Sequence, residues 1–163
     1  MVEGTGLHTG RAATARCTGA PSGQGIVFRR TDLEGSPSIP ARITEVQSTE
    51  RRTALGRGEA SVQTVEHLLA AAASLALDDM TVELDGPEPP IGDGSFTQFL
   101  SALTEAGIAE IPGNPVVYRV TTPFQLSEGD SSYVVAPAPA ALRPHEGNRT
   151  CAPPPAPART RRA

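Results

Sequence analysis

The sequence predicts an α+β fold, a two-layer sandwich in which two helices pack on a mostly antiparallel sheet. Short runs of β-branched and aromatic residues, separated by turn residues, indicate strands. Two longer stretches repeat apolar residues every three or four positions, which is the spacing of an amphipathic helix. After residue 136 the chain becomes rich in proline, alanine and arginine without any period, so the folded part is expected to end there.

Five short segments have the composition of strands. Residues 25–30 are rich in β-branched and aromatic side chains. Residues 39–43 favour an edge strand, because Pro40 has no N–H to donate to a central ladder. Residues 80–84 alternate apolar and polar side chains, which indicates a half-buried strand, and the Asp-Gly-Pro that follows is typical of a turn. The other two segments are residues 116–121 and 133–136.

Two helices are predicted from the apolar spacing. The first is expected to begin at Ser61 or Thr64, because either hydroxyl can cap a helix, and to end at Leu77. The second is expected to begin at Ser95 and to end at Gly107, a residue that favours the left-handed cap. The apolar faces consist of Val62, Val65, Leu68, Leu69, Ala72 and Ala76 on the first helix, and Phe96, Phe99, Leu100 and Leu103 on the second.

Glu66 and His67 are the residues of the first helix whose side chains could bind a metal or transfer a proton. His67 lies about 200° from Val65 around a helix, on the side of Ala70, Ala71 and Ser74, so it is predicted to point away from the core of its own domain. A neutral imidazole is a good zinc ligand, and a neighbouring carboxylate can take a proton from metal-bound water. The pair alone is also typical of an exposed polar surface, because one ligand does not define a metal site.

Two loops carry further polar residues, and both are interpreted as structural. Residues 4–10 are rich in glycine but lack the Lys-Ser/Thr ending of a phosphate-binding loop, which favours a turn. Residues 85–95 hold several carboxylates in front of the second helix. Asp93 or Ser95 is expected to cap that helix instead of binding calcium.

The remaining features restrict the class of protein. Cys17 and Cys151 fit no metal or disulfide spacing and are interpreted as unrelated thiols, and His145 is assigned no function. The net charge of −4 argues against a nucleic-acid binder, although residues 137–163 are basic, with five arginines and one glutamate. Neither a membrane-spanning run nor a secretory signal is evident, so a cytoplasmic protein is expected.

Five segments form a set that is more specific than any one of them. They are residues 4–10 (GTGLHTG), 25–33 (GIVFRRTDL), 39–41 (IPA), 61–71 (SVQTVEHLLAA) and 84–95 (LDGPEPPIGDGS). In this order and spacing, over residues 2–136, the chain resembles the UDP-3-O-acyl-N-acetylglucosamine deacetylases, zinc amidases of lipid A biosynthesis.

The resemblance implies an enzyme of two similar domains, each a sheet layered with two helices, with the active site between them. Residues 1–112 then form the amino-terminal domain, residues 113–136 the first strands of a second domain, and residues 137–163 a disordered tail. His67 takes the position of a zinc ligand and Glu66 that of the general base. The expected reaction is the zinc-dependent hydrolysis of the N-acetyl group of UDP-3-O-acyl-N-acetylglucosamine.

The other metal ligands implied by the resemblance are a histidine and an aspartate four residues later, both in the second domain. This sequence contains no such His-x-x-x-Asp segment. We therefore expect a truncated or frameshifted chain with little activity alone. Two alternatives remain open. One is a non-catalytic domain that binds a sugar nucleotide or a partner across Ala70, Ala71 and Ser74, and the other is one half of a split enzyme.

Overall fold

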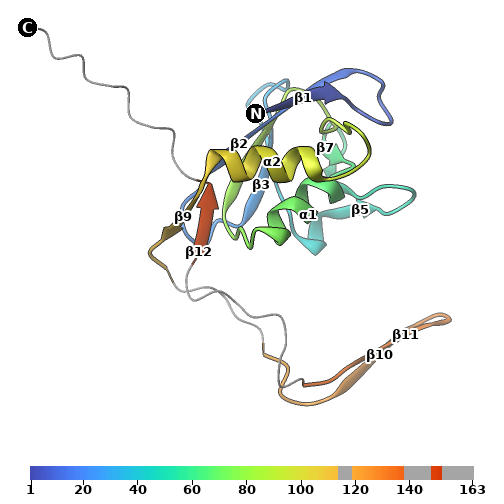
Figure 1. Cartoon of the computed structure of the whole chain (residues 1–163). Coiled ribbons are helices and arrows are strands. Elements are labelled where there is room, and N and C mark those ends of the chain that lie inside the picture. Colours follow the sequence, from blue (N-terminus) through green and yellow to red (C-terminus); the bar gives the residue numbers. More distant parts are fainter. Residues whose placement is uncertain (114–118, 138–147, 152–163) are drawn as a thin grey trace, which may run out of the picture.

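A five-stranded sheet lies at the centre of the protein, in the spatial order β1-β2-β8-β3-β4 (Figure 1). The structure is a computed structural model that describes residues 1–113, 119–137 and 148–151. Within this sheet β3 and β8 run parallel, and the other three pairings are antiparallel. The strands are β1 (Val2–Thr5), β2 (Ala12–Gly19), β3 (Ile26–Arg30), β4 (Ser38–Pro40) and β8 (Met80–Leu84).

Two helices lie over this sheet and contact each other, as Figure 1 shows for α1 and α2. A smaller sheet of three antiparallel strands, in the order β5-β6-β7, contacts the β3 and β4 side of the large sheet. The predicted α+β sandwich of two helices on a mostly antiparallel sheet is confirmed. These elements are η1 (Ile43–Glu45), β5 (Val46–Ser48), β6 (Ala54–Arg57), β7 (Ala60–Gln63), α1 (Glu66–Ser74) and α2 (Thr97–Ala106).

The core lies between the helices and the large sheet, and β8 shows how the sequence builds it. Met80, Val82 and Leu84 are fully buried, whereas Thr81 and Glu83 between them are only half-buried, as the alternating pattern predicts. Burial of each such apolar side chain contributes about 1.5–3 kcal/mol. The helices supply the facing side chains, among them Leu68, Ala72, Phe99 and Leu103.

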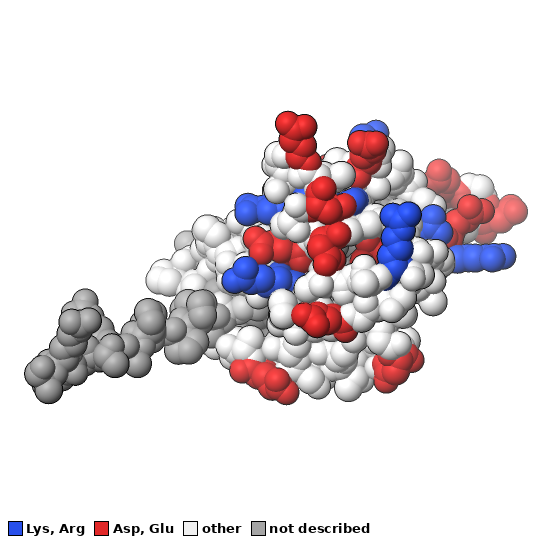
Figure 2. Space-filling view, turned by 90° about the horizontal axis from the view of Figure 1, so that it is seen from above, with Lys and Arg blue, Asp and Glu red and all other residues white. Residues whose placement is uncertain are grey.

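The face of the sheet opposite the helices carries charges. Glu83 lies between Arg16 and Arg29, with N–O distances of 3.7 and 3.9 Å. Exposed pairs of this kind contribute about 0–1 kcal/mol to the free energy of folding, so they stabilise the sheet very little. Figure 2 shows acidic and basic side chains interspersed over the face of the molecule seen from above. The domain therefore has two layers, with one side of its large sheet open to water.

The start of the first helix differs from the prediction. Residues 60–63 pair with β6 as strand β7, and α1 begins only at Glu66. Thr64 has a φ of 56°, which is incompatible with an α-helix and separates the strand from the helix. Neither Ser61 nor Thr64 is therefore the N-cap. The apolar Val62 belongs to β7 and reaches the same core from there.

The end of this helix also comes earlier than Leu77. Ala76 has a φ of 50°, and the amides of Ala76 and Leu77 donate to the carbonyls of Ala73 and Ala72. This is the double hydrogen bond of a Schellman motif. Alanine occupies the left-handed position that is usually glycine, so no residue there signals the end of the helix.

The second helix agrees better with its prediction. It spans Thr97–Ala106, and Gly107 follows it with φ 82° and ψ 159°, a conformation that favours glycine but is not the predicted left-handed cap. The Ser95 hydroxyl accepts the amide of Thr97, and Asp93 accepts both the amide and the hydroxyl of Ser95. Residues 93–95 thus hold the turn before the helix, but the N-cap is Phe96 without a side-chain cap hydrogen bond, so the prediction that Asp93 or Ser95 caps α2 is wrong.

The strand predictions succeeded where β-branched residues are dense. Residues 25–30, 39–43, 80–84 and 133–136 correspond to β3, β4, β8 and β11, and β4 lies at the sheet edge as Pro40 requires. Residues 119–121 form no strand, and the rest of the segment 116–121 lies outside the described residues, as does His145. The other described strands, β1, β2, β5, β6, β7, β9, β10 and β12, correspond to none of the five predicted segments.

Part of the predicted tail is ordered against the domain. Residues of β12 (Asn148–Cys151) pair antiparallel with β9 (Ile108–Ile111). Cys151 is buried in the core, and Cys17 packs against the same core. Burial, followed by the neighbouring Cys151, raises the pKa of Cys17 to about 12. Both thiols are free, as predicted. The prediction that they are unrelated is wrong, because Cys151 lies near Cys17.

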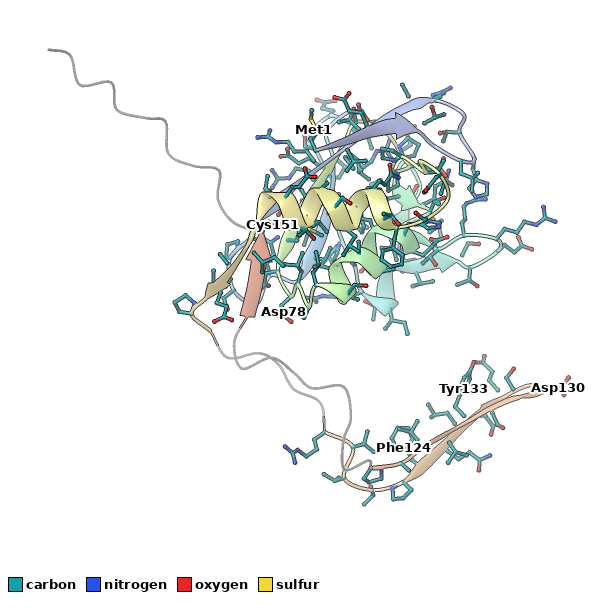
Figure 3. The ribbon with its side chains drawn as sticks, viewed as in Figure 1. Met1, Asp78, Phe124, Asp130, Tyr133 and Cys151 are labelled. Atoms are coloured by element: carbon teal, nitrogen blue, oxygen red, sulfur yellow. The ribbon has the colours of Figure 1, made fainter. Side chains whose placement is uncertain are left out.

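Residues 124–135 form a hairpin of β10 (Phe124–Glu128) and β11 (Ser131–Val135). Figure 3 shows it apart from the rest of the structure, with Phe124 and Tyr133 along its length. All but one of its strand residues are exposed, and the exception, Val135, is only half-buried. The hairpin therefore belongs to no core within the described residues.

Candidate functional site

The turn from β7 into α1 places Glu66 and His67 at the start of the helix. Only Thr64 and Val65 lie between the two elements, and Thr64 is in the left-handed region. That conformation costs a β-branched residue about 1–3 kcal/mol. The turn is held because Thr64 is buried and its hydroxyl donates to Glu88 Oε1 over 2.6 Å.

Glu88 is a buried carboxylate that joins this turn to the glycine-rich loop, residues 4–10. Its side chain accepts the amide of His8 at 3.0 and 3.1 Å and the amide of Thr9 at 2.9 Å. Burial alone raises the pKa of Glu88, but the donors Thr64, Thr9 and His8 together hold it below its usual range. Glu88 is therefore a stable anion inside the protein.

Gly6 shows how closely the loop approaches this carboxylate. A Cβ at Gly6 would lie 2.6 Å from Glu88 Oε2 and would also collide with the Thr9 hydroxyl. The loop is a structural turn, as predicted, and it closes on itself through hydrogen bonds of Gly6 and Gly10. The role of Glu88 was missed, because an acid in a loop between prolines carries no signal of burial.

Glu66 is half-buried in the first turn of α1. Its Oε2 accepts the backbone amide of Thr53, in the connection between β5 and β6, over 3.1 Å. A carboxylate at a helix N-terminus also interacts favourably with the helix dipole. The carboxylate is thus oriented by a hydrogen bond from outside its own helix, from the β5–β6 connection.

His67 is half-buried, and its Nδ1 is buried without a hydrogen-bond partner among the residues that the structure describes. Buried polar atoms in proteins are nearly always paired, so this one requires an explanation. The neighbours Ala70 and Ser74 are exposed, as predicted. Ala71 is fully buried, so the prediction of an open Ala70, Ala71 and Ser74 surface is wrong at its centre. Ala71 belongs to the hydrophobic core cluster on α1.

Zinc chemistry can be compared with the donors present. His67 supplies a nitrogen of the kind that zinc binds, and Glu66 beside it can accept a proton. No cluster of three or more His, Cys, Asp or Glu side chains suited to a metal occurs within residues 1–113, 119–137 and 148–151. The described residues therefore fit one part of a zinc site and not the whole of it.

Comparison with known proteins agrees with the family that the five motifs indicate. The model of the family described as UDP-3-O-acyl N-acetylglycosamine deacetylase matches residues 1–145. The chain belongs to this family. The resemblance to the UDP-3-O-acyl-N-acetylglucosamine deacetylases is confirmed.

Individual deacetylases support the same assignment. The chain is 42% identical over 137 residues to the UDP-3-O-acyl-N-acetylglucosamine deacetylase of Bdellovibrio bacteriovorus, covering 84% of this chain and 45% of that protein. It is 42% identical over 137 residues to the enzyme of Myxococcus xanthus, covering 84% and 44%. It is also 43% identical over 138 residues to the bifunctional enzyme LpxC/FabZ of Chlorobaculum tepidum, covering 83% and 30%. The chain thus spans less than half the length of these relatives.

No helix among the described residues has the length and apolar character that crossing a membrane requires.

Proposed function

We propose that this chain carries the Glu66–His67 part of the active site of a deacetylase that acts on UDP-3-O-acyl-N-acetylglucosamine. The observation that carries the proposal is the pair itself, an imidazole and a carboxylate fixed at the first turn of α1. The names of the relatives give the substrate.

The proposed chemistry is the hydrolysis of an amide. A bound zinc ion would polarise the acetamide carbonyl and make water more acidic. His67 would hold the metal, and Glu66 would remove the proton from the attacking water. The carbonyl carbon gains the oxygen of water, the C–N bond breaks, and the nitrogen leaves with a proton as the free amine. The products are acetate and the deacetylated sugar nucleotide.

A second segment is needed for this chemistry, because a catalytic zinc usually has three protein ligands. We propose that it supplies the other ligands. We also propose that residues 113–136 begin the domain that carries this segment.

The exposed hairpin favours a related function, the binding of a complementary half of the enzyme. Directly opposite residues of a hairpin share a face. Phe124 pairs with Val135 and Leu126 with Tyr133, so these four apolar residues share one face. The other face carries Gln125, Ser127, Ser132 and Val134. A two-stranded hairpin is at best marginally stable alone, so a covering partner is expected for this face.

Complementation tests both ideas. The chain would be co-expressed with the part of the Bdellovibrio bacteriovorus relative that it does not match, and acetate release would be measured with and without a chelator. We expect zinc-dependent release that His67→Ala and Glu66→Gln abolish and His8→Ala, at an exposed histidine, preserves. Activity that persists in His67→Ala would refute the proposed site. Binding of the sugar nucleotide without zinc dependence would favour the non-catalytic domain.

A further inference from the structure

The direction of the first turn of α1 depends on a backbone conformation that its sequence does not favour. Thr64 is β-branched, yet its φ is 56°. Such residues rarely adopt the left-handed region unless the surroundings enforce it. Glu66 and His67 follow within three residues, so any relaxation of Thr64 changes where both side chains lie.

The enforcing contacts come from one extended segment, residues 87–91. The carbonyl of Pro87 accepts the amide of Gln63 at 2.9 Å, and Glu88 accepts the hydroxyl of Thr64 at 2.6 Å. Gln63, the last residue of β7, and Thr64, the first residue of the turn, are thus held by consecutive residues of the same segment. The segment is itself fixed, because the amide of Ile91 donates to Thr5 over 2.9 Å.

We propose that Glu88 is a positioning residue for the Glu66–His67 pair, acting through Thr64 and the glycine-rich loop. The inference rests on the proposed function of that pair. Glu88 touches neither Glu66 nor His67 in any described hydrogen bond, so it has no part in the reaction itself. Its carboxylate accepts hydrogen bonds from three donors in two distant parts of the chain, and in this way it holds the turn from β7 into α1.

The anionic form of Glu88 suits this task. The amides of His8 and Thr9 can only donate, so the group between them must accept on both sides. A carboxylate does so with both oxygens and still accepts the Thr64 hydroxyl. Removal of the side chain leaves these donors without their partner and frees Thr64 to relax.

Two probes in the intact chain report the position of the pair. The Thr53 amide reports Glu66, because it donates to that carboxylate and its hydrogen-exchange rate measures the bond. The imidazole resonances of His67 during titration with Zn²⁺ alone report the exposure of its ring to metal. The amides of β8 report global folding.

In Glu88→Ala and Thr64→Val we expect exchange at Thr53 to become about tenfold faster or more, and the His67 response to Zn²⁺ to weaken about fivefold, with β8 still protected. Thr64→Ser retains the hydroxyl and should stay near the wild type. Asp85→Ala is the matched control, because Asp85 accepts the amide of Thr14 at 2.7 Å and does not contact the turn.

Unchanged Thr53 and His67 signals in Glu88→Ala would overturn the inference. If that variant does not fold, the comparison of Thr64→Val with Thr64→Ser decides, and equal behaviour of the two overturns it. A wild-type His67 that ignores Zn²⁺ would instead refute the proposed metal role. The Thr53 amide would still decide the role of Glu88.

Discussion

The amide of Thr53 donates to Glu66 Oε2 over 3.1 Å, which ties the connection between β5 and β6 to the first turn of α1. The position of this carboxylate therefore depends on both α1 and the β5–β6 connection. The bond occupies one oxygen and leaves the carboxylate as an acceptor, which is what a proton-accepting group requires.

Glu66→Gln tests the proton-accepting role. The amide side chain keeps its shape and can still accept from Thr53, but it cannot take a proton from water. In the complemented enzyme we expect kcat to fall about 10²–10⁴-fold with little change in KM or in stability. Steady-state acetate release checks this. A loss of less than tenfold would remove Glu66 from the chemistry.

Gly6→Ala tests the close approach of the glycine-rich loop to Glu88. The added Cβ meets the Glu88 carboxylate at 2.6 Å, so we expect a loss of about 1–3 kcal/mol in the free energy of unfolding. Gly86→Ala is the matched control, because nothing lies within 4 Å of its Cβ and its φ is not positive. Denaturant titration measures both. Equal stability of the two variants would contradict the packing described.

The pKa of Glu88 predicts how stability depends on pH. Because its folded pKa lies below its unfolded pKa, the unfolded state binds the proton more readily. Its contribution is fully present above about pH 5 and is lost as pH falls through the folded pKa. As the pH falls from about 5 to about 3, the free energy of unfolding should therefore decrease less in Glu88→Gln than in the wild type. Parallel pH profiles from urea titrations would count against a buried anion at this position.

Arg30→Lys tests the support behind β7. The buried guanidinium binds Asp32 through two nitrogens at 2.7 and 2.8 Å and donates to the carbonyl of Ser61 at 2.6 Å. A lysine cannot make all of these bonds, so we expect a loss of about 2–3 kcal/mol. Arg29→Lys, at an exposed neighbouring site, should change little. Thermal unfolding of the two variants distinguishes the positions, and similar melting temperatures would contradict this role.

Local sequence patterns predicted the elements that depend on local forces. The alternation of β8, the edge position of Pro40 and the glycine after α2 each follow from properties of single residues. Strand β2 was missed because its alanine, arginine and threonine residues lack a strong strand signal, and long-range pairing with β8 decides its structure.

Sequence reasoning gave the two residues of the candidate site but not the long-range contacts around them. Glu66 and His67 were identified by family resemblance and lie together on α1. The resemblance did not give the contacts that orient them, since Glu88 is more than twenty residues from Thr64 and about eighty from the glycine-rich loop. The helix boundary was wrong because Thr64 takes a left-handed conformation that only tertiary contacts explain.

Zinc stoichiometry tests the central claim most directly. The chain would be purified together with the unmatched part of the Bdellovibrio bacteriovorus relative, and retained metal would be measured by elemental analysis after gel filtration. We expect about one zinc per complex in the wild type and in His8→Ala, and loss of the metal in His67→Ala, with the complex still assembled. Full retention of zinc in His67→Ala would contradict the assignment of His67 as a ligand.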